Sequence, residues 1–146
     1  IQAARWAREA GIPIVIDIDE LYDESTHELL RMVDYLIASS DFAEDPHELA
    51  DRYGCPVVGI TRGAEGASFF SGGHLVKSPA FKVPVADTTG AGDVFHGAFI
   101  YGLLQSWVLD DVIRFAHAAA AMKCMHIGAR SGIPSISEVR EFLSEN

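Results

Sequence analysis

The chain has 146 residues, 49% of them hydrophobic, so it can bury one substantial core and fits a single globular domain over residues 1–146. Twenty-one acidic residues against eleven basic ones give a net charge of −10, spread along the chain. This balance argues against a nucleic-acid surface, and charged residues interrupt every hydrophobic stretch before it could cross a membrane. Any bound phosphate must be held mainly by backbone amides and a metal ion.

The two cysteines, Cys55 and Cys124, lack metal-type spacing and fall in apolar segments. We expect both to be reduced core residues, as in a cytoplasmic protein. The chain starts at Ile1 with no capping residue ahead of its first helix, as a fragment would.

The first half of the chain alternates expected helices with expected strands. Apolar or β-branched runs predict buried strands at 13–17, 35–38 and 56–61. Each expected helix of this half carries a signal at one or both ends. The first helix stops at Gly11, the second starts with a capping box at Ser25 and Glu28, and the third has an N-cap at Asp45 before Pro46 and ends at Gly54. Such alternation on short connections indicates parallel βαβ units.

The pattern changes in the second half. Residues 67–71 and 74–78 predict two strands around a glycine turn, and 80–86 are expected to extend this antiparallel part. Most of the remainder is predicted to be helical, over 93–105, over 109–125 and after a capping box at Ser135 and Glu138.

Gly90-Ala91-Gly92 forms a turn that runs straight into a helix, within VADTTGAGDVFHGAF (85–99). The glycines permit backbone conformations closed to other residues, and Ala91 leaves the main chain within reach of a ligand. Unpaired N–H groups and the positive dipole end of the helix favour an anion there. The turn therefore predicts a phosphate or oxyanion cradle.

Asp93 places a carboxylate inside this anion site, where it repels phosphate. As a general base it would accept the proton of a substrate hydroxyl while neighbouring amides stabilise the transferred phosphoryl group. The alternative is that Asp93 is only a helix N-cap and the glycines only a turn.

The longer pattern DTTGAGDxFxGAF, from Asp87 to Phe99, resembles the C-terminal signature of the ribokinase-like, or PfkB, carbohydrate kinase family. The resemblance implies a ribokinase-like three-layer α/β/α fold with a mainly parallel sheet and an antiparallel hairpin. It covers essentially the whole chain but only the later part of a longer family chain, so the N-terminal part, with the lid and most sugar contacts, is missing. The chain is then the nucleotide-binding and catalytic-base portion of one kinase domain.

The resemblance also assigns roles to residues. Asp93 becomes the catalytic base and Gly90, Ala91 and Gly92 the anion hole of an ATP-dependent kinase that phosphorylates a small sugar. A nucleoside kinase of the same fold and a non-catalytic nucleotide-binding module remain as alternatives. The resemblance leaves room for a homodimer.

Two further segments are similar to nucleotide-binding elements of the family. TRGAEG matches a TxGxxG segment, which implies nucleotide contacts from Thr61, Gly63 and Gly66, although the segment could be only a turn between strands. RFAHAAAAMKC resembles the helix near adenine and would place His117 beside the base, with core packing as the alternative.

Family members often hold a monovalent cation near the glycine turn, so the resemblance allows K⁺ at Asp87, Thr89 and the loop 127–132. Gly132 stands where some relatives are expected to carry a hydroxyl ligand, so K⁺ is allowed rather than required.

The resemblance implies dependence on Mg²⁺ but leaves its ligands open. Many relatives carry an NxxE motif after the strand corresponding to 35–38. Residues 39–42 (SSDF) take its place without the carboxylate in the register we favour, whereas Asp41 and Glu44 supply a DxxE in the other. Asp17 and Asp19 also follow a strand, where α/β sheets place ligands, and we favour a loop-solvating role for them.

Overall fold

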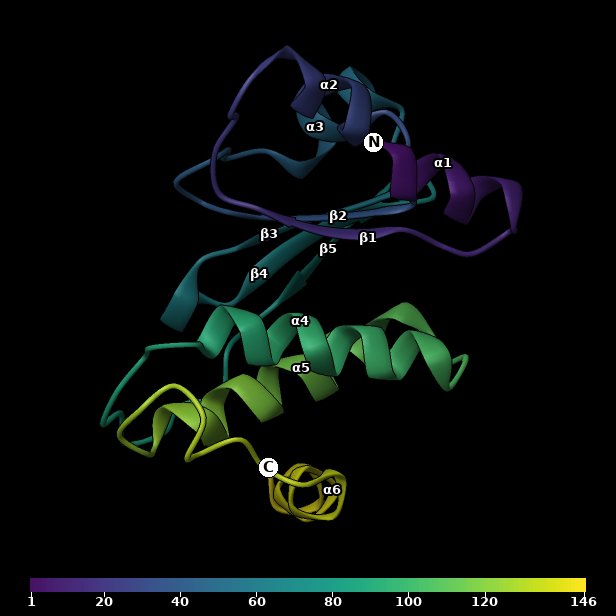
Figure 1. Ribbon diagram of the computed structural model, residues 1–146. Helices are drawn as coiled ribbons and strands as arrows, with labels where there is room; N and C mark the ends of the chain where they lie inside the picture. Colours follow the sequence, from purple (N-terminus) through teal and green to yellow (C-terminus); the bar gives the residue numbers. More distant parts are fainter. The chain divides into compact units, whose positions relative to one another are not determined.

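The computed structural model describes all residues, 1–146, and the chain forms two compact units, whose elements are shown in Figure 1. The first unit comprises Ile1–Gly63 and Ala67–Lys77, and the second comprises Ala64–Gly66 and Ser78–Asn146. Each unit has its own hydrophobic cluster of buried side chains.

The first unit contains three helices and the strands of one sheet. The elements are α1 (Gln2–Glu9), β1 (Val15–Ile18), α2 (Glu24–Leu30), β2 (Tyr35–Ser39), α3 (Pro46–Tyr53), β3 (Val57–Thr61), β4 (Ala67–Ser71) and β5 (His74–Ser78). The five strands lie in sequence order, with β1, β2 and β3 parallel and β4 antiparallel to β3. A two-residue connection, Gly72-Gly73, joins β4 to its neighbour β5, which only an antiparallel hairpin allows. Parallel units followed by a hairpin were predicted, and the prediction is confirmed.

The core of the first unit lies between the sheet and its helices, with α2 and α3 on one face (Figure 1). Side chains alternate between the two faces of a strand, so Leu36 of β2 and Val58 of β3 reach this core and are completely buried. Leu30 of α2 and Leu49 of α3 meet them from the helices. Burial of these apolar side chains is the main stabilising term for the unit.

The ends of α2 and α3 test the capping predictions. The capping box predicted at Ser25 is wrong, because the Asp23 carboxylate accepts the amides of Ser25 at 2.8 Å and Thr26 at 3.3 Å and is the N-cap. A charged acceptor upstream satisfies these amides first, so Ser25 becomes part of the helix. The predicted N-cap at Asp45 is confirmed, since its carboxylate accepts the His47 amide at 2.9 Å.

The second unit is helical. Its helices are α4 (Ala91–Leu104), α5 (Leu109–Cys124) and α6 (Ile136–Glu145), and a short 3-10 turn, η1 (Gly63–Glu65), lies at the boundary between the units. The capping box predicted at Ser135 and Glu138 is present. The strand predicted at 80–86 is absent, and Pro84 offers a reason because it has no N–H to donate to a neighbouring strand.

Helices α4 and α5 pack closely against each other. Gly102 of α4 permits this approach, because an added Cβ there would lie 3.0 Å from Val112 Cγ2. Tyr101, Trp107 and Phe115 form an aromatic cluster with ring centroids 5.1 to 5.6 Å apart. None of the helices combines the length and hydropathy that a membrane span requires.

Both cysteines are buried free thiols, as predicted. Cys55 is 5% exposed and Cys124 is 9% exposed. Burial raises the pKa of each thiol, which suppresses the reactive thiolate.

Gly59 of β3 lies opposite Phe69 of β4, and we predict that this strand position tolerates no side chain. A Cβ at Gly59 would be 2.3 Å from Phe69 Cε1, and the Phe69 ring is completely buried. Gly59→Ala should therefore lower the free energy of unfolding of the full-length protein by about 1–3 kcal/mol in urea titrations.

Two further variants control this measurement. Gly97→Ala, on an exposed helical surface with open space around the new Cβ, should gain about 0.5–1 kcal/mol instead. The double variant Gly59→Ala/Phe69→Leu should lose less than the sum of its single changes, because the smaller side chain relieves the clash. Strict additivity would show that the ring does not cause the loss.

Candidate active site

The glycine turn before α4 depends on a left-handed residue at its centre. Gly90 is the N-cap of α4 with φ 77° and ψ 9°, and its position is fixed by an Ala91 N–H donated to Thr88 O at 3.0 Å. An added Cβ at Gly90 would lie 3.1 Å from the Ala129 carbonyl oxygen. Both the backbone angle and the close approach of a neighbouring loop therefore require glycine.

Two backbone amides of this helix start are left without an acceptor in the chain. Ala91 donates to Thr88 and Val94 donates to Gly90, whereas Gly92 and Asp93 have no such bond. They lie at the positive end of the dipole of a 14-residue helix. The anion hole predicted at residues 90–92 thus includes the free amide of Gly92, and the free amide of Asp93 is a donor that the sequence did not indicate.

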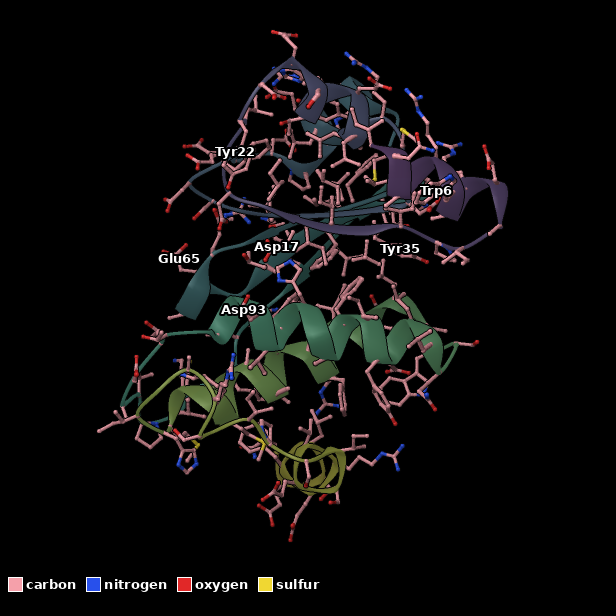
Figure 2. The ribbon with its side chains drawn as sticks, viewed as in Figure 1. Trp6, Asp17, Tyr22, Tyr35, Glu65 and Asp93 are labelled. Atoms are coloured by element: carbon pink, nitrogen blue, oxygen red, sulfur yellow. The ribbon has the colours of Figure 1, made fainter.

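The Asp93 side chain lies on the first turn of α4 (Figure 2). It is the third residue of the helix, is exposed and makes no hydrogen bond or ion pair, so it is not the N-cap. One turn later, His96 Nδ1 donates to Gly92 O at 2.8 Å, a contact that the sequence did not indicate. The arrangement presents a carboxylate and two N–H donors side by side.

Asp87 holds the start of the turn through both of its carboxylate oxygens. One accepts the Thr89 amide at 2.9 Å and the Thr89 hydroxyl at 2.7 Å, and the other accepts the Gly128 amide at 2.8 Å. The Thr89 amide and hydroxyl, followed by the Gly128 amide, hold the pKa of Asp87 at about 2. The ionised carboxylate thus ties the turn to the loop after α5.

Residues at the end of α5 also form hydrogen bonds with the backbone of Asp87. The Cys124 carbonyl accepts the amides of Ala86 at 2.8 Å and Asp87 at 3.1 Å. Lys123 Nζ donates to the Asp87 carbonyl oxygen at 2.8 Å, and the Lys123 side chain is completely buried. Sequence reasoning missed Lys123, although a lone lysine in an alanine-rich buried helix is a signal that could have found it.

The three residues of the TRGAEG segment occupy special backbone positions. Thr61 ends β3, and its hydroxyl donates to the Ala38 carbonyl at 3.2 Å. Gly63 and Gly66 have φ values of 53° and 94°, and a Cβ at Gly66 would lie 2.1 Å from the Ser78 carbonyl oxygen. Thr61 and Gly63 belong to the first unit, whereas the glycine turn belongs to the second.

His117 lies on α5 and is 6% exposed, with the Phe95 ring 5.1 Å from it in an edge-to-face contact. Burial lowers the pKa of His117 to about 4, so the imidazole is neutral at pH 7. Its Nε2 has no hydrogen-bond partner in the chain. The side chain therefore packs in the core while keeping one free polar atom.

The carboxylates singled out after the first two strands lie in the first unit. Asp17 is an exposed residue of β1 (Figure 2), and Asp19 follows that strand. Asp41 and Glu44 are exposed in the connection after β2. Phe42, between them, packs against the core of the first unit.

Comparisons with known proteins show the family to which the chain belongs. The family model for pfkB family carbohydrate kinases matches residues 1–136. The ribokinase of Lactococcus lactis subsp. lactis (strain IL1403) is 37% identical over an alignment of 124 residues that covers 81% of this chain and 41% of that protein.

Solved structures extend the likeness to three dimensions. A ribokinase from Arabidopsis thaliana complexed with ribose and ATP is 25% identical with a TM-score of 0.85, covering 97% of this chain and 51% of that chain. The aminoimidazole riboside kinase of Salmonella enterica, complexed with aminoimidazole riboside and an ATP analog, is 26% identical with a TM-score of 0.86, covering 98% and 56%. This chain thus spans about half the length of the proteins that it matches. The chain has the ribokinase-like α/β fold and belongs to the pfkB family of carbohydrate kinases.

Proposed function

We propose that the protein containing this chain transfers the γ-phosphoryl group of ATP to a hydroxyl group of a small sugar. The observation that carries the proposal is the exposed Asp93 carboxylate beside the two free amides at the start of α4. Membership of a carbohydrate kinase family and the likeness to ribokinases support the sugar as acceptor.

The proposed reaction uses these groups in one displacement. The acceptor oxygen forms a bond to the γ-phosphorus, the bond between that phosphorus and the ADP oxygen breaks, and the hydroxyl proton passes to Asp93. The amides of Gly92 and Asp93 stabilise the negative charge of the transferred group. Neither amide has to leave another partner first, so the donors are already organised for the transition state.

Magnesium would arrive with ATP and neutralise part of its phosphate charge. Mg²⁺ is usually bound through substrate phosphates, waters and one or two carboxylates, so it needs few protein ligands. The exposed carboxylates of Asp41 and Glu44 have the right chemistry for such ligands. They are candidates only in the alternative register that supplies a DxxE, since the register that we favour places no carboxylate there.

The nucleotide contacts proposed for this chain are Thr61, Gly63, Gly66 and His117. Gly63 is exposed and has a left-handed backbone, so its main-chain groups are open to a ligand without a side chain in the way, whereas Gly66 is buried against the Ser78 backbone. The free Nε2 of His117 is a polar atom able to accept or donate one hydrogen bond. Two free thiols suit a reducing compartment, and we place the reaction in the cytoplasm.

A nucleoside acceptor is the second candidate. The likeness to a kinase whose structure holds aminoimidazole riboside favours it. Both acceptors offer a ribose-type hydroxyl to the same base, so the position of Asp93 does not separate them. Phosphorylation assays that compare ribose-type sugars with nucleosides would do so.

Asp93→Asn should lower kcat by on the order of a hundredfold or more while ATP binding and stability persist, because the asparagine side chain cannot accept the hydroxyl proton as a carboxylate does. The measurement is ADP release by the full-length protein across a panel of sugars and nucleosides. Asp111→Asn is the matched control, since Asp111 is also an exposed third residue of a helix, α5. Equal turnover by Asp93→Asn and the wild type would refute the assignment, and ATP binding with no product from any acceptor would favour the non-catalytic module.

Gly92→Ala should distinguish an effect on phosphoryl transfer from an effect on folding stability. A Cβ at Gly92 meets no atom within 4 Å, so stability should be unchanged or slightly raised, while the methyl group crowds a phosphoryl group at the free amides. We expect at least about a tenfold loss of kcat/KM in steady-state assays, equivalent to about 1.4 kcal/mol. Gly90→Ala is the contrasting variant and should also unfold at lower temperature, because φ is 77° there. Normal kinetics in Gly92→Ala would rule out the cradle.

A further inference from the structure

Lys123 is a completely buried lysine next to the candidate active site. Lysine is almost never fully buried unless it is paired, because removing an ammonium group from water is costly. Its Nζ has one hydrogen bond in the chain, to the main-chain oxygen of Asp87 at 2.8 Å. The side chain therefore requires an explanation beyond filling space in the core.

With the bond from Lys123, the amide, the carboxylate and the carbonyl group of Asp87 all have hydrogen-bond partners in the chain. The amides of Ala86 and Asp87 donate to the Cys124 carbonyl, and the Asp87 carboxylate accepts hydrogen bonds from Thr89 and Gly128. The Asp87 carbonyl oxygen is the remaining backbone group, and it accepts a hydrogen bond from Lys123 Nζ. Three residues further on, Gly90 starts the turn that presents the free amides.

The residues expected to bind a monovalent cation do not fit one well in this structure. The Asp87 carboxylate oxygens already accept three hydrogen bonds, and the Asp87 carbonyl accepts the lysine. At Gly132 an added Cβ would lie 2.5 Å from His126 Cβ and 2.9 Å from the Lys123 carbonyl oxygen, so a residue with a hydroxyl side chain has no room there. A cation at Asp87 would also lie close to a buried ammonium and be repelled.

We propose that Lys123 is a positioning residue whose ammonium group supplies, within the chain, the positive charge that braces the Asp87 turn. The protein consequently binds ATP and transfers phosphate without a monovalent cation. The kinetic half of this inference rests on the proposed function, whereas the binding half does not.

The first test needs no variant. Full-length protein freed of K⁺ is compared in potassium chloride and in tetramethylammonium chloride at equal ionic strength, with Mg²⁺ present in both. Calorimetric ATP affinity, melting temperature and turnover should be the same in the two salts. Activation or tighter ATP binding by about tenfold in K⁺ would overturn the proposal.

The second test removes the charge. Lys123→Met keeps an unbranched side chain of similar length, and Lys82→Met makes the same charge change at an exposed site. Below the melting temperature of each variant, Lys123→Met should weaken ATP binding and lower kcat by about tenfold or more, with KM for the acceptor unchanged, because the turn serves the phosphoryl group. Lys82→Met should match the wild type. Wild-type ATP binding and kcat in folded Lys123→Met would overturn the positioning role.

These readouts distinguish the two proposals. If the wild type phosphorylates no acceptor, the proposed function fails, and ATP affinity in the two salts still decides the inference about Lys123. If Lys123→Met does not fold, the comparison of salts on the wild type decides it alone.

Discussion

The ionised carboxylate of Asp87 is the constraint on which the candidate site depends. It accepts hydrogen bonds from Thr89 within the turn and from Gly128 in the loop after α5, so one side chain joins two segments that are 41 residues apart. Hydrogen bonds to a charged acceptor are stronger than those between neutral groups. Because these hydrogen bonds hold the loop after α5 beside the turn, Gly90 lies against Ala129, and α4 starts with the amides of Gly92 and Asp93 unpaired.

The organisation of charge around this turn follows a consistent logic. The amides of Thr89 and Gly128 and the Lys123 ammonium group donate to Asp87, while the amides of Gly92 and Asp93 have no acceptor in the chain. Because a net charge of −10 gives the chain no general attraction for phosphate, the proposed anion cradle relies on the positive dipole end of α4. The proposed base is acceptable in such a site because it acts on the acceptor hydroxyl rather than on the phosphate.

Local signals predicted most elements correctly, and both failures concern the partners of backbone N–H groups. The Asp23 cap displaced the expected Ser25 box because neighbouring acceptors compete for the same amides, which spacing alone does not resolve. The expected strand at 80–86 failed although its apolar residues favour one, since a strand also needs a partner for its N–H groups. Both outcomes depend on which groups are close in space.

By itself the sequence determined the alternation of strands and helices, the hairpin, the glycine turn and the candidate base, because these depend on neighbours within a few residues. The tertiary structure decided which amides at the helix start stay free and showed that Gly90, not Asp93, is the N-cap. It also brought the Lys123 ammonium to the Asp87 carbonyl, a contact across 36 residues of chain. No periodicity or spacing encodes such a contact, since it exists only after the end of α5 has packed beside the turn.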